Sequence, residues 1–220
     1  SFVGVIAGLL AMRLEPFERS VIESPWEHLR DGFRFVFEQR RIRDLLLLMA
    51  AATISLVPAL VLMPFFADEM LGRGSRGLGL LLAAMGVGAL VGTLGLAVRG
   101  KHGELGKVVQ WGSAGLGAGL ILLAVSRNFN LSMAIMMGVG FSGLRHMAAT
   151  NTMIQSLVPD EYRGRIMAMY TMTVVGLGPF GSLAAGAAAE QWGPPVTVAA
   201  GGVLCLAASA LYRARGGRKG

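Results

Sequence analysis

The amino-acid sequence is poor in charge and nearly devoid of cysteine. Of its 220 residues, 15% are charged, whereas soluble domains carry about 25%. The single cysteine, Cys205, excludes an internal disulfide framework and a cysteine metal cluster. No H-E-x-x-H helix, phosphate-binding glycine loop or paired-carboxylate arrangement occurs. We therefore predict no enzyme active site, no cofactor and no metal site.

Apolar and small residues take the place of the missing charge. Hydrophobic residues make up 54% of the chain, which also contains 32 glycines and 13 methionines. The mean hydropathy is +0.59. This composition is typical of membrane proteins, in which small residues let neighbouring helices approach closely. We predict an all-α membrane protein.

Six apolar segments are long enough to cross a bilayer as helices, which takes roughly 20 residues. They span residues 45–66, 77–98, 108–125, 131–154, 166–189 and 196–212. An earlier apolar run, 1–12, is too short to span. We interpret it as the end of a truncated transmembrane helix and expect the chain to be a fragment of a longer protein.

Residues 13–44 form a charged connector that contains seven arginines and seven acidic residues. Ser24, Pro25 and Glu27 fit an N-cap, a first helical position and a capping box. Apolar residues then recur at helical spacing, which predicts an amphipathic helix along the membrane surface or beneath the bundle. Residues 213–220 form a basic tail.

Basic residues are distributed unevenly between the two sets of connectors. One set, together with the tail, holds 16 Lys and Arg residues, whereas the other holds Arg73, Arg76 and Arg127. This asymmetry predicts that the 13–44 connector and the C-terminus are cytoplasmic. The formal net charge of +7 is thus explained by membrane orientation, and we expect no nucleic-acid partner.

Half a helix, a long amphipathic connector and six more spans resemble a major facilitator superfamily transporter cut near its middle. Pro159, Arg163 and Gly164 resemble the superfamily's P-x-x-x-R-G signature. The run 176–186 resembles its exporter-associated Gly-Pro-Gly helix, through Gly176, Gly178, Pro179, Gly181 and Gly186. The stretch 151–172 is similar to the transmembrane secretion effector branch that includes enterobactin exporters. The connector 99–107 departs from the superfamily's G-x-x-x-D-R-x-G-R-R loop because its Asp is absent, which weakens a gating role for that connector.

This resemblance implies a six-helix bundle at residues 45–212 that is half of a twelve-helix fold. It also implies secondary active transport, namely proton-coupled export of a small amphiphile or siderophore across a bacterial inner membrane by alternating access. The expected partners are the lipid bilayer, the substrate, protons and the missing N-terminal half of the same transporter.

Two ionisable residues within one span are the first candidates for substrate binding or coupling. Arg145 lies inside segment 131–154, and we place it in the cytoplasmic part of the bilayer. There it either faces a cavity and binds an anionic group, or pairs with another residue, or snorkels to the surface. His146 is a candidate for proton coupling or a hydrogen-bonded structural residue.

Polar residues and prolines supply further candidates. Asn151 follows on the same span and either faces a cavity or has a packing role. The resemblance implies that the first complete span lines the central cavity of the superfamily fold, so that Thr53, Ser55 and Pro58 face substrate or form a gate. The alternative is a packing kink in which the hydroxyl groups bond to their own backbone. For the glycine-rich run around Pro179 we favour a conformational and packing role without direct substrate contact.

Two rival functions are weaker. The GFSG sequence at 140–143 matches the G-x-S-G of rhomboid intramembrane proteases, but its serine would need a histidine from a different helix, and His146 lies on the same one. A self-contained six-helix oligomeric scaffold without transport activity is the other alternative, and the truncated first helix argues against it.

Overall fold

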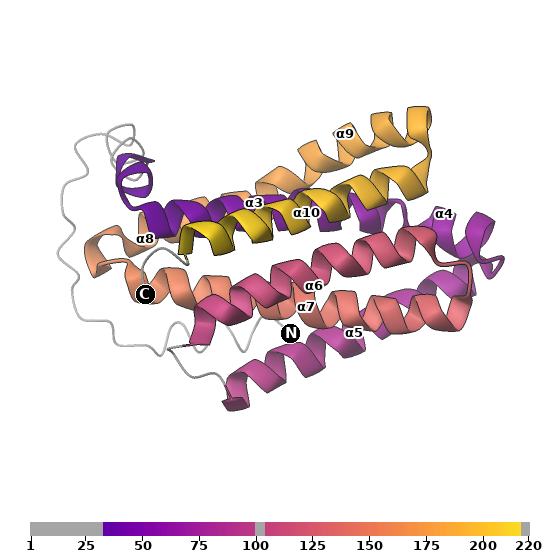
Figure 1. Cartoon of the computed structure of the whole chain (residues 1–220), viewed down its shortest axis with the longest axis horizontal. Coiled ribbons are helices and arrows are strands. Elements are labelled where there is room, and N and C mark those ends of the chain that lie inside the picture. The colour runs from indigo at the N-terminus through magenta and orange to yellow at the C-terminus, as the bar shows by residue number, and fades with distance from the viewer. Residues whose placement is uncertain (1–32, 100–103, 217–220) are drawn as a thin grey trace, which may run out of the picture.

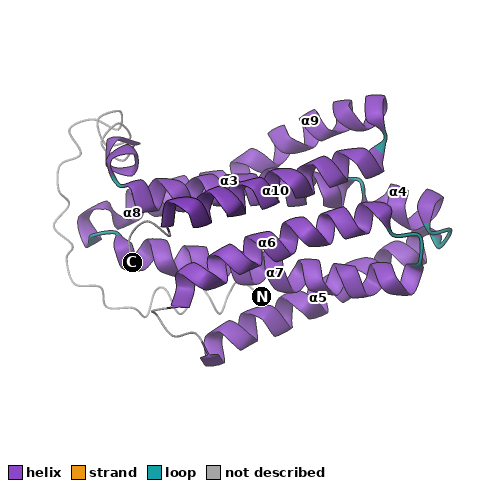
Figure 2. Ribbon diagram, in the orientation of Figure 1, coloured by secondary structure: helices purple, strands orange, loops and turns teal. Residues whose placement is uncertain are grey.

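The computed structural model describes residues 33–99 and 104–216, and no β-strand occurs among them. Figures 1 and 2 show a bundle of long helices joined by short connections. The helices are α3 (Arg40–Val61), α4 (Met63–Phe65), α5 (Gly74–Arg99), α6 (Leu105–Val125), α7 (Phe129–Leu157), α8 (Asp160–Thr171), α9 (Leu177–Trp192) and α10 (Pro194–Gly216). Two π-helical segments, η1 (Phe66–Met70) and η3 (Met172–Gly176), interrupt this series.

Five of these helical segments are long and apolar enough to cross a membrane: α3, α5, α6, α10 and the continuous stretch 160–192 that joins α8, η3 and α9. They correspond to five of the six predicted spans, and the expectation of an all-α membrane bundle is confirmed. The sixth predicted span coincides with α7. Its 29 residues are long enough to span, but Arg145 and His146 interrupt its apolar sequence.

The long helices pack in a defined order of neighbours. Helix α7 lies between α5 and α6, and α10 lies against both α6 and α3. Helix α9 packs mainly on α3 and diverges from α10 toward the upper right of Figure 1. A buried core of apolar side chains from α3, α5, α6, α7 and α10 joins these pairs.

Glycine allows two of the helix pairs to approach to backbone contact. A Cβ atom on Gly88 of α5 would lie 1.9 Å from the Met137 carbonyl oxygen of α7, and one on Gly140 of α7 would lie 1.9 Å from the Met85 carbonyl oxygen of α5. The α6–α10 pair meets in the same reciprocal way, because a Cβ on Gly117 or Gly202 would lie 2.7 Å from the other's carbonyl oxygen. The small residues thus set the helix spacing, as the composition predicted.

The connector before the bundle is described only from residue 33. Residues 33–38 are helical, Val36 is buried, and the Phe35 ring stacks on Tyr162 with 4.6 Å between centroids. The predicted capping residues Ser24, Pro25 and Glu27 lie outside the described residues, as do segment 1–12 and residues 217–220 of the tail. Gln39 breaks the helix, and α3 begins at Arg40, so the first spanning helix starts earlier than the predicted residue 45.

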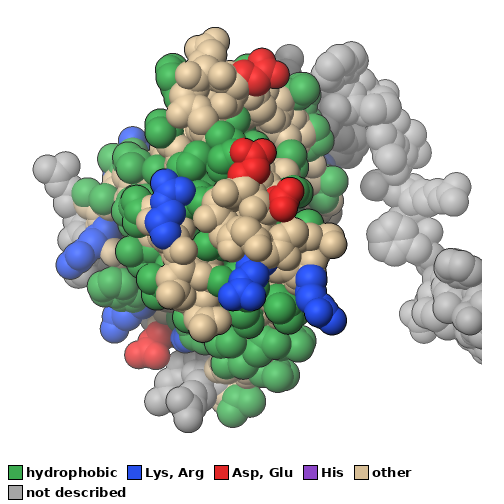
Figure 3. Space-filling view, turned by 90° about the vertical axis from the view of Figure 1, so that its right-hand side faces the viewer, with side chains coloured by type: hydrophobic (Ala, Val, Ile, Leu, Met, Phe, Trp, Pro, Cys, Tyr) green, Lys and Arg blue, Asp and Glu red, His purple; other side chains and the backbone are tan. Residues whose placement is uncertain are grey.

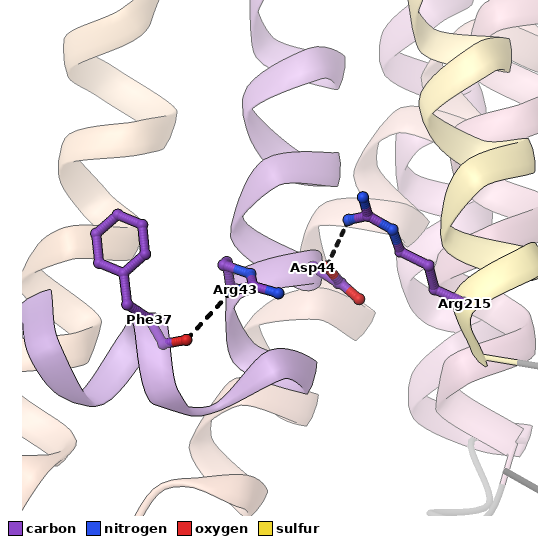
Figure 4. A network of polar contacts seen from close by, with 4 residues as sticks. All are labelled: Phe37, Arg43, Asp44 and Arg215. Carbon is purple, nitrogen blue, oxygen red and sulfur yellow. Dashed lines mark hydrogen bonds and ion pairs between the residues drawn. The ribbon is translucent and has the colours of Figure 1, made fainter. Parts of the chain in front are cut away.

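The two ends of the bundle differ in charge. Figure 3 looks onto the end that holds α4, where basic and acidic side chains both lie among hydrophobic ones. At the other end, the start of α3 meets the end of α10 through an ion pair between Asp44 and Arg215, with 3.1 Å between Oδ1 and Nη1 (Figure 4). Arg43 Nη1 donates to the Phe37 carbonyl oxygen at 3.2 Å. The ion pair ties the start of α3 to the end of α10, and the Arg43 bond ties α3 to the helical residues 33–38 before it.

Candidate functional site

Helix α7 carries three of the five predicted substrate or coupling residues. It begins at an N-cap, Asn128, whose side-chain oxygen accepts a hydrogen bond from the Leu131 backbone N–H at 3.1 Å. It then runs antiparallel to α6, and Gly112 and Gly115 of α6 let the two helices come close. A Cβ on Gly112 would lie 2.9 Å from the His146 Cβ, and one on Gly115 would lie 2.5 Å from the Ser142 Oγ.

His146 is enclosed at this α6–α7 contact. Its side chain is 1% exposed, and its Nδ1 lies 2.9 Å from the Val109 carbonyl oxygen of α6. Because a carbonyl oxygen only accepts hydrogen bonds, Nδ1 carries the hydrogen and donates it. In the neutral ring, Nε2 is then the basic nitrogen.

Two buried polar atoms next to this contact lack hydrogen-bond partners among the described residues. They are Nε2 of His146 and Oγ1 of Thr150. Residues four apart lie on the same face of a helix, so the imidazole and the hydroxyl group occupy adjacent turns. A buried lone pair without a donor is costly, which marks Nε2 as a place where a water molecule or another hydrogen-bond donor would be stabilised.

Arg145 lies on a different face of α7, in a pocket of about 250 Å³ between α6 and α7. Its guanidinium carbon is 5.4 Å from the Phe141 ring centroid. The pocket is lined by Glu104, Lys107, Val108, Trp111, Gly112, Phe141, Ser142 and Arg145. None of these residues belongs to α3 or α9, so Arg145 does not share this pocket with Thr53 or Ser55.

Asn151 lies toward α8 rather than beside Arg145. Its Oδ1 accepts a hydrogen bond from Gln155 Nε2, one turn further along α7. Tyr170 of α8 donates its hydroxyl hydrogen to the Met147 carbonyl oxygen of α7 at 3.0 Å. The polar residues of α7 therefore face three different surroundings.

On α3, Thr53, Ser55 and Pro58 are all buried. Ser55 Oγ lies 2.7 Å from both the Ala51 carbonyl oxygen of its own helix and the Gly201 carbonyl oxygen of α10. Ser55 is thus a contact between α3 and α10, and its bond to Ala51 fits the packing interpretation of this residue. Pro58 does not end the helix, because α3 continues to Val61.

Comparison with known proteins decides the family. A profile described as transmembrane secretion effector, from the major facilitator group, matches residues 1–216. The chain belongs to this transporter family. It is also 27% identical over 199 residues to the multidrug efflux pump Tap of Mycolicibacterium fortuitum, a match that covers 88% of this chain and 48% of Tap. The chain thus spans about half the length of this curated relative.

The P-x-x-x-R-G signature of this secretion effector chain lies mostly in a helix and not in a loop. Only Val158 and Pro159 separate α7 from α8, and Pro159 is the N-cap of α8. Arg163 pairs with Asp160 at 2.7 Å on the exposed first turn. Acidic residues at a helix start and a following arginine are favourable there, and this explains why helix formation extends into the connector between the spans predicted at 131–154 and 166–189.

The glycine-rich run of the secretion effector chain has two distinct parts. Cβ atoms on Gly178 and Gly181 would contact Val57 and Ile54 of α3 at 3.3 Å, whereas Gly186 has nothing within 4 Å and Gly176 meets only Met172 of the preceding turn. Pro179 is exposed and follows the π-helical segment η3. Because proline removes one backbone donor, a widened turn before it is expected.

Sequence reasoning did not connect Thr150 with His146, or Lys107, Glu104 and Trp111 with Arg145. Thr150 was detectable, because it lies four residues after His146 and thus on the same helical face. The α6 residues gave no such signal, since only the folded bundle brings them beside Arg145.

Proposed function

We propose that this chain forms one half of a proton-driven exporter of small amphiphilic molecules. Membership of the secretion effector family supports outward transport in general. The similarity to a multidrug efflux pump favours amphiphiles of varied structure, and siderophores remain a narrower substrate class within the proposal. The single structural observation that supports proton coupling is the buried Nε2 of His146, which has no hydrogen-bond partner among the described residues.

The proposed partner is an N-terminal half that packs against α5 and the 160–192 stretch. These two segments are the least buried of the candidate spans, with 22% and 11% of their most apolar windows buried. Large apolar side chains protrude from both, including Leu90 and Leu94 of α5 and Phe180 and Leu183 of α9. The match to about half of the curated relative agrees with a second bundle of similar size.

His146 couples proton binding to helix packing in this proposal. A proton on Nε2 would convert the ring to a charged imidazolium and add a donor that has no acceptor among the described residues. The charged groups Glu104, Lys107 and Arg145 line the pocket beside this contact. Protonation would therefore favour separation of α6 from α7 at the Gly112 contact, and deprotonation would favour its closure.

The proposed orientation places the basic end of the bundle and the C-terminus in the cytoplasm. The Asp44–Arg215 ion pair joins the start of α3 to the end of α10, so both belong to one membrane side. Arg73, Arg76 and Arg127 lie at the opposite end, together with the acidic Asp68, Glu69 and Glu190. The excess of positive charge at the first end supports the cytoplasmic assignment.

Substrate contact stays a prediction for Arg145, Asn151 and Thr53. Ser55 is the weakest of the predicted contacts, because its hydroxyl group is taken up by the α3–α10 interface. Arg145→Ala with unchanged efflux would remove Arg145 from the substrate path.

A dye-efflux experiment on the protein as its gene encodes it tests the proposal. Cells that express it should expel a lipophilic dye or a catecholate siderophore, and a protonophore should abolish the expulsion. His146→Asn keeps a donor near the position of Nδ1 and removes the basic nitrogen. This variant should retain substrate exchange at equal pH and lose accumulation against a gradient. Gradient-driven efflux at the wild-type rate in His146→Asn would refute the coupling role.

A further inference from the structure

The pocket beside Arg145 has the charge and the position of a phosphate site at the membrane surface. Lys107 and Arg145 contribute two positive charges, and Glu104 contributes one negative charge. Within 4 Å, neither cation forms an ion pair with any residue that the structure describes. The pocket is therefore left with one net positive charge, which equals the charge needed to neutralise one phosphodiester.

The helix contacts fix the depth of this pocket. Gly112 of α6 abuts His146, so Arg145 lies beside the seventh or eighth residue of α6, about 10 Å along from its first residue at 1.5 Å per residue. A Cβ atom added to Gly106 would lie 3.9 Å from the Met153 Cε of α7, so these two residues lie at a similar depth. Because α6 is a candidate span that begins at Leu105, the pocket extends from the bilayer boundary into the adjacent part of the acyl-chain region.

Aromatic side chains complete the pocket on its membrane side. Trp111 is 67% exposed on the second turn of α6, at a depth where tryptophan is enriched in membrane proteins. Phe141 supports the guanidinium of Arg145 from within the pocket. A ligand here would thus meet cations near the polar boundary and apolar rings below them.

We propose that this pocket binds the phosphodiester group of a membrane glycerophospholipid. Lys107 and Arg145 neutralise the phosphate, while Trp111 and Phe141 contact the glycerol and the first acyl carbons. Glu104, exposed at the mouth, accepts hydrogen bonds from an ammonium or hydroxyl group of the headgroup. A long arginine side chain reaching toward the boundary keeps its charge near such headgroups. The inference does not depend on the transport proposal.

Lipid retention by the detergent-purified protein, as its gene encodes it, provides the test. Native mass spectrometry would compare phosphatidylglycerol with diacylglycerol of the same acyl chains, so that the headgroup phosphate is the main difference. Lys107→Gln and Arg145→Gln each remove one cation of the pocket. Arg213→Gln removes an exposed positive charge at the same end of the bundle but outside the pocket. Lys107 is exposed, so its replacement tests the site without disturbing the core.

We expect the wild type and Arg213→Gln to retain phosphatidylglycerol in preference to diacylglycerol. Each pocket variant should weaken that retention about tenfold, which is the effect of one charge-assisted hydrogen bond. Equal retention of the two lipids, or pocket variants that bind like Arg213→Gln, would overturn the proposal. Displacement of the lipid by inorganic phosphate at low millimolar concentration would overturn the lipid assignment, since it would identify the pocket as a site for soluble phosphate.

Discussion

Replacement of Gly140 by alanine is the sharpest test of how α5 and α7 are held together. The added Cβ would lie 1.9 Å from the Met85 carbonyl oxygen, whereas ordinary contact begins at 3.4 Å. The colliding atom is backbone, so no side-chain rotation relieves the overlap. The helices must separate locally by about 1.5 Å, the difference between these two distances.

Two contributions to the free energy of unfolding oppose each other when Gly140 becomes alanine. Alanine favours a helix over glycine by about 1 kcal/mol, but overpacking a tight contact costs about 1–3 kcal/mol and sometimes more. We expect Gly140→Ala to lower the free energy of unfolding by up to about 2 kcal/mol, which is the overpacking cost less the gain in helix propensity.

Gly138, two residues earlier on α7, is the matched control because a Cβ there has no atom within 4 Å. Gly138→Ala should stabilise the protein by up to about 1 kcal/mol through helix propensity alone. Unfolding in a detergent titration, followed by circular dichroism, would compare the two variants. Equal stability of Gly138→Ala and Gly140→Ala would refute the glycine-controlled spacing of α5 and α7.

Three further experiments test other contacts of the bundle. Asp44→Asn should lower the free energy of unfolding by about 1–2 kcal/mol, because it removes the charge of the buried partner of Arg215. Thermal unfolding would detect this effect, and an unchanged midpoint would contradict it. Ser55→Ala should cost about 1 kcal/mol of stability and leave the substrate concentration for half-maximal efflux unchanged; the reverse pattern would place this residue in the substrate path. Gly181→Leu should impair folding because the new side chain collides with α3, whereas Gly186→Leu should fold normally. Similar yields of the two folded proteins would exclude a packing role for the glycine run.

Hydropathy was sufficient to predict the long helices because five of the six spans contain a continuous apolar run and the sixth is interrupted only at Arg145 and His146. It placed their ends less well. Helix α3 begins at Arg40 and α8 at Asp160, since charged residues at membrane boundaries are compatible with helix and simply project into water. Gln39 gave no proline or glycine signal for the break that precedes α3.

The surroundings of the polar residues were not predictable from their own helix. Arg145 and His146 are adjacent in sequence, yet one lines an open pocket and the other is enclosed against Val109. Successive residues of a helix differ by about 100° in direction, and which direction meets a neighbour depends on the glycine contacts between helices. The family resemblance made Ser55 a cavity candidate, whereas the packing of α3 on α10 makes it a contact between these helices.

Proton movement in reconstituted vesicles tests the central claim most directly. The protein as its gene encodes it would be placed in proteoliposomes with a pH-sensitive dye inside, and a transported amphiphile would be added on one side. We predict that substrate movement shifts the internal pH in wild-type vesicles, and that His146→Asn abolishes the shift while substrate binding persists. Substrate transport without any proton movement in the wild type would contradict the account.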